Sequence, residues 1–346
     1  MKLVFFILTV IIISSCSNTG HAQISIDKIL SQQYEFKMIS SGINRPNFNP
    51  SGSFFTEILV LLHHGISTKE IQNYFNWDEM TLNAKLEILK NANFIKSGVD
   101  GRFYPTVFIC SLPDGAKIAS QVSLIAKQTA DSINKKSYLI RQAVQKVEAF
   151  KNLPFEDVSL LVLSDVLLDN WQINNVENDL LKSPRTLRHG KNYYASYQEK
   201  NKGTYSEAFG IYGNQMENAG SFTICRYGNR RYSPEVIGLN SELKKEYLSS
   251  RSLKITSCPV IGESDNDQLQ KIADSFKPTL LKILNNKIEM IRDNYQMSIY
   301  SKEISFEEYF IWIYHFIYTA VTDELISRKV IKLPEKNVAF YILKND

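Results

Sequence analysis

Residues 54–75 read FFTEILVLLHHGISTKEIQNYF, and this pattern predicts two short helices joined by a tight turn. The first helix carries apolar residues around its circumference and ends at Gly65, a residue type common at helix ends. Ser67 and Glu70 follow with the spacing of a capping box, in which each side chain accepts a bond from the other residue's backbone amide. The second helix is therefore expected to start at about residue 67.

A third helix and a pair of strands follow. Leu82, Leu86 and Leu89 are spaced i, i+4 and i+7, which predicts an amphipathic helix over about 78–91. The next segment, FIKSGVDGRFYPTVFIC, has the pattern of a strand, a glycine turn and a second strand. This order resembles the winged helix-turn-helix of bacterial transcription regulators, so we expect a winged-helix domain at residues 46–110.

The charges of this domain argue against DNA as its ligand. In the regulators that it resembles, the third helix enters the major groove. Between Ser67 and Tyr104 there are five basic and five acidic residues, so the segment has no net charge. Because neutralisation of phosphates dominates affinity for DNA, we expect an interaction module and no nucleic-acid partner. Winged helices often pair, so a homodimer is compatible with this layout.

The N-terminus predicts export. Residues 3–13 form a mainly apolar run after Lys2, as in a signal peptide, and the run is too short to span a bilayer. The segment ISSC, residues 13–16, resembles the lipobox of bacterial lipoproteins, which implies cleavage before Cys16 and acylation of its thiol. An alternative is cleavage after Ala22, which would give a secreted protein. We expect a signal peptide at 1–15, lipidated Cys16 with a flexible tether at 16–45, and a membrane-anchored, periplasm-facing location in the bacterial cell envelope.

Composition sets further limits. The 346 residues are 44% hydrophobic and 12% aromatic, which is enough for packed cores. A formal net charge of +4 is too small to indicate a polyanionic partner. The layout resembles that of uncharacterised lipoproteins from bacteria related to Bacteroides, a resemblance that implies no activity.

The rest of the chain predicts an α+β fold in which the winged helix is followed by a mixed α/β body at residues 111–346. A long amphipathic helix is expected over about 116–150. Residues 189–232 are rich in tyrosine and are interrupted by Gly203, Gly213 and Gly220, which predicts an antiparallel meander.

Basic residues flank this meander, and they are the candidate ligand-binding residues. If the meander brings its ends together, they form a cationic rim that could hold an anionic ligand, such as a phosphorylated glycan or a lipid headgroup. The alternative is a solvated edge that discourages strand-to-strand aggregation. These residues are Arg185, Arg188, His189, Lys191, Arg226, Arg230 and Arg231.

Four residues are candidates for catalysis. Asp165 and Asp169 are four residues apart and would share one face of a helix. A helix starting at Ser305 would place Glu308 and His315 on one face, but roughly 10 Å apart along its axis. The alternatives are helix-capping aspartates and a histidine satisfied within the core. No nucleophile, metal or cofactor motif accompanies these residues, so no metal site or cofactor is expected.

We therefore expect an exported, lipid-anchored envelope protein of a non-catalytic binding type. Its ligand would be a protein partner or an anionic envelope molecule. One alternative is an envelope hydrolase that uses His315 with carboxylates, which requires these side chains to converge in one pocket. The other is a winged-helix regulator that binds DNA.

Overall fold

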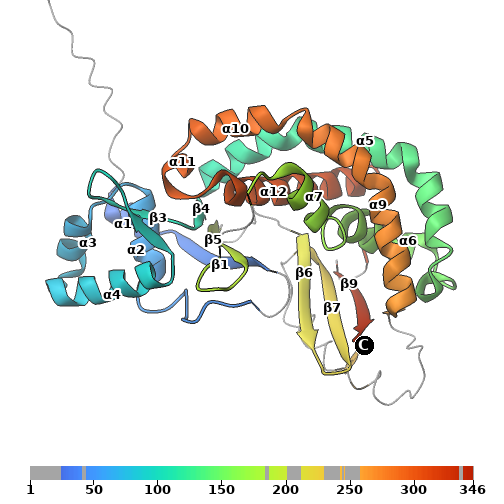
Figure 1. The fold of residues 1–346 in the computed structure, drawn as a ribbon, viewed down its shortest axis with the longest axis horizontal. Helices are drawn as coiled ribbons and strands as arrows, with labels where there is room; N and C mark the ends of the chain where they lie inside the picture. The colour runs from blue at the N-terminus through green and yellow to red at the C-terminus, as the bar shows by residue number, and fades with distance from the viewer. Residues whose placement is uncertain are drawn as a thin grey trace, which may run out of the picture.

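The computed structural model describes residues 25–40, 44–183, 187–200, 212–229, 242–243, 245, 258–334 and 338–345. Within them the chain forms an α+β fold. Short helices lie at the N-terminal end, and long helices arch over small sheets at the other end (Figure 1).

The N-terminal unit, defined here as α2 to β3, consists of three helices and two antiparallel strands in the order that the sequence predicts. Ser67 and Glu70 form both bonds of the capping box at the start of α3. The Asp78 side chain caps α4 by accepting a bond from the Thr81 amide at 2.7 Å. The elements are α2 (Phe55–His63), α3 (Thr68–Phe75), α4 (Glu79–Asn91), β2 (Ile95–Ser97) and β3 (Phe103–Pro105).

A three-stranded sheet separates the N-terminal unit from the body. Its central strand is β5 (Tyr193–Lys200), which is antiparallel to β1 (Gln33–Ser40) and parallel to β4 (Phe108–Cys110). Successive side chains of β5 point to opposite faces. Tyr193 and Tyr197 therefore pack into the core of the N-terminal unit, whereas Tyr194 packs into the core of the body.

This sheet corrects the tether predicted at 16–45. The structure describes residues 25–40 and 44–45 of that range, and within the first of these lie α1 (Ile26–Leu30) and β1. The tether was inferred from the polar residues just after Cys16, whereas strand formation here depends on pairing with β5, which is more than 150 residues away in sequence.

The predicted meander at 189–232 is wrong as a single sheet. β6 (Tyr212–Asn218) and β7 (Phe222–Asn229) do form an antiparallel hairpin, but β5 belongs to the other sheet. β7 is antiparallel to β9 (Val338–Lys344), and β9 is parallel to β8 (Val260–Ile261). The tyrosine-rich segment is thus divided between two sheets, since β5 pairs with β1 and β4 whereas β7 pairs with β6 and β9.

The body is built around α12 (Phe306–Ser327), which is buried along most of its length and packs against α5 (Leu112–Val144). Helix α6 (Phe155–Leu160) is continued by a π-helical turn (Leu161–Val166). No helix in the described part of the chain is both long and apolar enough to cross a membrane. The remaining elements are a 3₁₀ turn (Glu148–Phe150), α7 (Ile173–Leu180), α9 (Glu263–Asn285), α10 (Ile288–Gln296) and α11 (Tyr300–Glu303).

Candidate binding site

A tight turn immediately before β5 positions part of the predicted cationic rim. Arg188 and Lys191 exchange backbone hydrogen bonds of 2.9 Å in both directions, and His189 and Gly190 between them have φ values of 50° and 70°. Two positive φ values in a two-residue turn correspond to type I′ geometry, which glycine adopts freely and histidine rarely. Paired residues of such a turn project their side chains to the same face, so Arg188 and Lys191 lie on one side.

This turn lines a pocket of about 240 Å³. One wall is the end of α4, a second is the segment that precedes α2, and a third is the first residue of β5. The pocket therefore lies where the N-terminal unit meets the central sheet. Its lining residues are Asn47, Phe48, Ile88, Asn91, Ala92, Arg188, His189, Lys191 and Tyr193.

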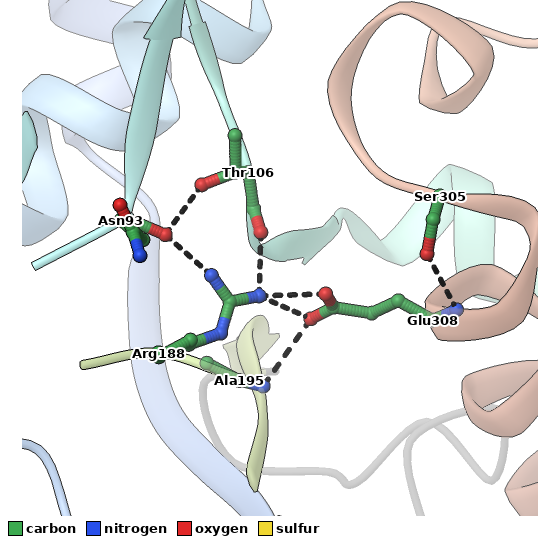
Figure 2. Close-up of polar contacts among 6 residues, drawn as sticks. All are labelled: Asn93, Thr106, Arg188, Ala195, Ser305 and Glu308. Atoms are coloured by element: carbon green, nitrogen blue, oxygen red, sulfur yellow. Dashed lines mark hydrogen bonds and ion pairs between the residues drawn. The ribbon is translucent and has the colours of Figure 1, made fainter. Parts of the chain in front are cut away.

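Arg188 is a buried and rigid part of this wall. Its Nη2 atom lies 2.6 Å from Glu308 Oε2 on α12 and donates to the Thr106 carbonyl at 2.6 Å, and its Nη1 atom donates to the Asn93 carbonyl (Figure 2). The amide of Ala195 also donates to Glu308, at 3.4 Å. The charge of Arg188 is thus largely compensated within the protein, but its Nε atom is buried without a hydrogen-bond partner in the described chain.

Lys191 is the cationic residue of the pocket lining whose charge is not paired with a described carboxylate. Its side chain is half-buried, and neither Lys191 nor the exposed His189 forms an ion pair with a described residue. The C-terminal end of α4 contributes a partial negative charge here, worth about 0.3–1 kcal/mol for a nearby ion. This partial charge opposes an anion, so among the described lining residues the attraction for a small anion rests on Lys191.

Arg226, the other described member of the predicted rim, does not line this pocket. Arg226 lies on β7 in the other sheet, where its Nη2 atom donates to Gln215 Oε1 at 2.7 Å. Arg185, Arg230 and Arg231 lie outside the described residues, as does the predicted lipidation residue Cys16. Among the described members of the rim, those that line the pocket are Arg188, His189 and Lys191.

The predicted catalytic residues have separate surroundings, and none of them lines the pocket. Glu308 binds Arg188, and His315 Nδ1 lies 2.8 Å from the Ile311 carbonyl within a shell of aromatic rings. Asp165 lies by contrast against β6 and β9. The described contacts therefore do not bring Glu308, His315 and Asp165 to one reacting centre.

Asp165 and Asp169 do lie close enough to influence each other. Burial, followed by the charge of Asp169, raises the pKa of Asp165 well above its usual range. Asn214 Nδ2 donates to Asp165 Oδ1 at 2.7 Å, and the Tyr341 hydroxyl lies 3.0 Å from Asp165 Oδ2 and 2.9 Å from Asn214 Oδ1. Sequence reasoning missed Asn214 and Tyr341 because only the sheet that contains β6 and β9 brings them to the π-helical turn.

A second buried ionic contact joins the N-terminal unit to the body. His63 Nδ1 at the end of α2 lies 2.9 Å from both carboxylate oxygens of Glu303 on α11. Burial alone would lower the pKa of His63, but the Glu303 carboxylate raises it above its usual value.

Among the described residues, no group of three histidine, cysteine, aspartate or glutamate side chains is arranged to hold a metal ion.

Comparisons with known proteins add no assignment. No family model matches the sequence, and neither a curated protein nor a solved structure matches it.

Proposed function

We propose that this protein is an exported, lipid-anchored binding protein of the bacterial cell envelope, and that it holds a small anionic ligand in the pocket beside Lys191. The observation that carries the proposal is the meeting of Arg188, His189 and Lys191 at one pocket. A solvated sheet edge would not require a cavity, a buried guanidinium and a histidine held at positive φ.

The lining indicates the chemistry of the ligand. Lys191 supplies a charged donor, whereas the guanidinium of Arg188 is engaged by Glu308 and by backbone carbonyls. The amides of Asn47 and Asn91 can bind hydroxyl groups, while the Phe48 and Tyr193 rings offer apolar contact. A volume of about 240 Å³ is slightly below the usual range for drug-sized ligands, so the pocket suits a single phosphorylated sugar or a small headgroup.

The N-terminal unit would act as an interaction module in this proposal. Its three helices followed by two antiparallel strands support the winged-helix interpretation. Its six acidic and five basic residues favour a role in forming the pocket wall rather than in binding DNA. Export and acylation at Cys16 rest on the signal-peptide pattern of residues 3–16.

Ligand titration tests the proposal. The full-length protein in detergent is titrated calorimetrically with glucose 6-phosphate and, separately, with glucose. We expect binding of the phosphorylated sugar and at least tenfold weaker binding of glucose, since a charge-assisted hydrogen bond contributes about 1.5–3 kcal/mol.

A pair of variants locates the binding site. Lys191→Gln should weaken binding roughly 10- to 100-fold, whereas Lys127→Gln on the exposed face of α5 should leave it unchanged. Absence of binding to either sugar, or equal affinities of the two variants for the phosphorylated sugar, would overturn the proposal.

A further inference from the structure

Four aromatic side chains gather on the surface of the N-terminal unit, where the end of α3 meets the start of α2. The rings of Phe75 and Trp77 stack with centroids 4.5 Å apart, and the centroid of Phe54 lies 5.3 Å from the first and 5.4 Å from the second. The Tyr74 ring meets Phe75 edge-on at 5.1 Å. Phe54 is 47% exposed and Tyr74 is 43% exposed. We call these four residues the aromatic cluster.

The position of Phe54 requires a strained backbone. This residue precedes α2 with φ 67° and ψ 18°, a left-handed conformation that a bulky side chain rarely adopts, and Ser53 before it has φ 55°. Lys85 on α4 fixes this turn, since its Nζ atom donates to the Ser53 carbonyl at 3.0 Å and lies 5.5 Å from the Phe54 ring centroid. Strain of this kind is concentrated at ligand-binding sites, so a strained and half-exposed ring indicates a binding partner.

The aromatic cluster lies beside the point where the described chain begins. The Tyr74 hydroxyl donates to Asp27 Oδ1 at 2.7 Å, and Asp27 lies in the first turn of α1, two residues after Ser25. Ser25 follows Cys16 by nine residues, which can extend over at most about 30 Å. An acyl chain on Cys16 would therefore hold the cluster close to the bilayer surface.

We infer that the aromatic cluster docks onto the lipid bilayer that holds the acylated N-terminus, with its rings among the headgroups. Tyrosine and tryptophan are enriched at this depth of a membrane, because their rings are apolar and their polar atoms can reach water. The tether makes docking an intramolecular step, so a weak affinity of the cluster for lipid is sufficient. The N-terminal unit thus lies against the membrane.

The charges beside the cluster favour lipid over a polyanion. Asp27 binds Tyr74, and Asp78 follows Trp77 directly in sequence. A nucleic acid or an acidic glycan would bring its own negative charges to these carboxylates. The headgroup of phosphatidylcholine carries no net charge, so docking on this lipid needs no cationic surface.

This inference rests on the proposed acylation of Cys16, and it does not depend on the ligand proposed beside Lys191. Fatty-acid labelling of the protein therefore accompanies the test. Unlabelled Cys16 would overturn the proposed anchor together with the inference, whereas labelled Cys16 without docking would overturn the inference alone.

Quenching of tryptophan fluorescence by brominated lipid tests the docking. The acylated protein is reconstituted into phosphatidylcholine vesicles whose acyl chains carry bromine, and its emission is compared with that in the same lipid without bromine. Trp171 and Trp312 are buried, whereas Trp77 is partly exposed, so quenching reports on Trp77. We expect emission of the natural protein to be quenched and emission of Trp77→Phe to be unaffected by bromine.

Phe54→Asn separates docking from folding. Asparagine adopts the left-handed conformation more readily than phenylalanine, so this variant should be at least as stable in urea as the natural protein. Loss of the exposed ring should lower the ratio of docked to free cluster about tenfold and reduce the quenching of Trp77. Tyr138→Asn removes a 68% exposed aromatic ring from α5 and should leave the quenching unchanged.

Three results would overturn the inference. The first is a natural protein whose emission is the same in both lipids. The second is quenching that persists in Trp77→Phe, because it would come from another tryptophan. The third is quenching of Phe54→Asn equal to that of the natural protein and of Tyr138→Asn.

Discussion

Arg188 and Glu308 form a buried ion pair, with 2.6 Å between Nη2 and Oε2, and their side chains are only 5% and 10% exposed. The pair connects the turn before β5 with the first turn of α12 (Figure 2). Because the same guanidinium donates to the backbone carbonyls of Asn93 and Thr106, it also fastens the N-terminal unit to the body. Arg188 therefore fixes the position of the pocket wall, and Lys191 remains available to a ligand.

Glu308→Ala should lower the free energy of unfolding by about 3–5 kcal/mol, because it leaves a buried guanidinium without its counter-charge. Urea denaturation monitored by circular dichroism measures this loss. The double variant Arg188→Met with Glu308→Leu should be less destabilised than Glu308→Ala alone, since it buries no unpaired charge.

The exposed pair between Arg141 and Glu156 is the control, and Glu156→Gln there should change stability far less. A double variant that is as unstable as Glu308→Ala would show that packing, and not the unpaired charge, dominates at this position.

Sequence alone predicts those parts of the fold that depend on local spacing. The start of α3 follows from the capping residue Ser67 and the extent of α4 from leucine periodicity, and the structure confirms both. The predicted start of α12 at Ser305 is also confirmed, since Ser305 accepts a bond from the Glu308 amide at 3.1 Å. The Glu308 side chain does not complete a capping box, because it binds Arg188.

Features that depend on distant pairing were not predictable in this way. Local sequence does not predict β1, because this strand forms only by pairing with β5, which begins at Tyr193. Likewise, the basic residues Arg188 and Lys191 were recognised as candidates, but Asn47 and Asn91 were not, since only the folded chain brings them to the same pocket. The separation of Arg226 from this group follows from the division of the tyrosine-rich segment between two sheets.

Acylation at Cys16 is open to a direct test. Metabolic labelling with a clickable fatty acid should label the natural protein and not Cys16→Ala, because only the thiol at the lipobox accepts the acyl chain. Membrane fractionation should then show the natural protein in the membrane fraction and Cys16→Ala released from it. An unlabelled, uncleaved protein in the cytosol would contradict the proposed location and make DNA binding the first alternative to examine.

The pKa values of the two adjacent histidines at the end of α2 should be shifted in opposite directions from the usual value. Glu303 raises the pKa of His63, whereas burial and the neighbouring His63 lower the pKa of His64 to about 4. Proton NMR of the imidazole rings, assigned with His63→Gln and His64→Gln, measures both values. Removal of the counter-charge in Glu303→Gln should bring the pKa of His63 below 6.5, because burial then outweighs the remaining charge of Asp114.

The raised pKa of His63 determines how its contribution to the free energy of unfolding changes with pH. The folded protein holds this proton more tightly than the unfolded chain does, so the contribution of His63 is fully present below about pH 6.5. At more acidic pH the contact is lost when the carboxyl of Glu303, whose pKa is raised by burial, takes up a proton. This stabilisation is lost as the pH rises through the folded pKa. A natural protein in which His63 titrates below 6.5 would contradict the assignment of this contact as an ion pair.

Asp165 should be protonated in the folded protein. Besides burial, the number of protons available for the hydrogen bonds around it gives a second reason. A tyrosine hydroxyl has one proton, yet the Tyr341 hydroxyl lies within hydrogen-bond distance of Asp165 Oδ2 and Asn214 Oδ1. If Tyr341 donates to Asn214, then Asp165 must donate to Tyr341, and the Asn214 amide completes the ring by donating to Asp165 Oδ1. Every member of this ring is satisfied only when Asp165 is neutral.

Asp165→Asn should therefore preserve the ring, because an amide can donate to Tyr341 and accept from Asn214. The pKa of Asp165 is raised in the folded state, so its contribution to stability is present at acidic pH. That contribution declines as the pH rises above about 4, by about 1.4 kcal/mol for each pH unit up to the folded pKa.

Melting temperatures between pH 5 and pH 9 should fall less steeply with pH for Asp165→Asn than for the natural protein. Asp131→Asn, which removes an exposed carboxylate on α5, should retain the natural slope. Equal slopes for Asp165→Asn and the natural protein would mean that Asp165 is already ionised in the folded state and that Tyr341 donates to it.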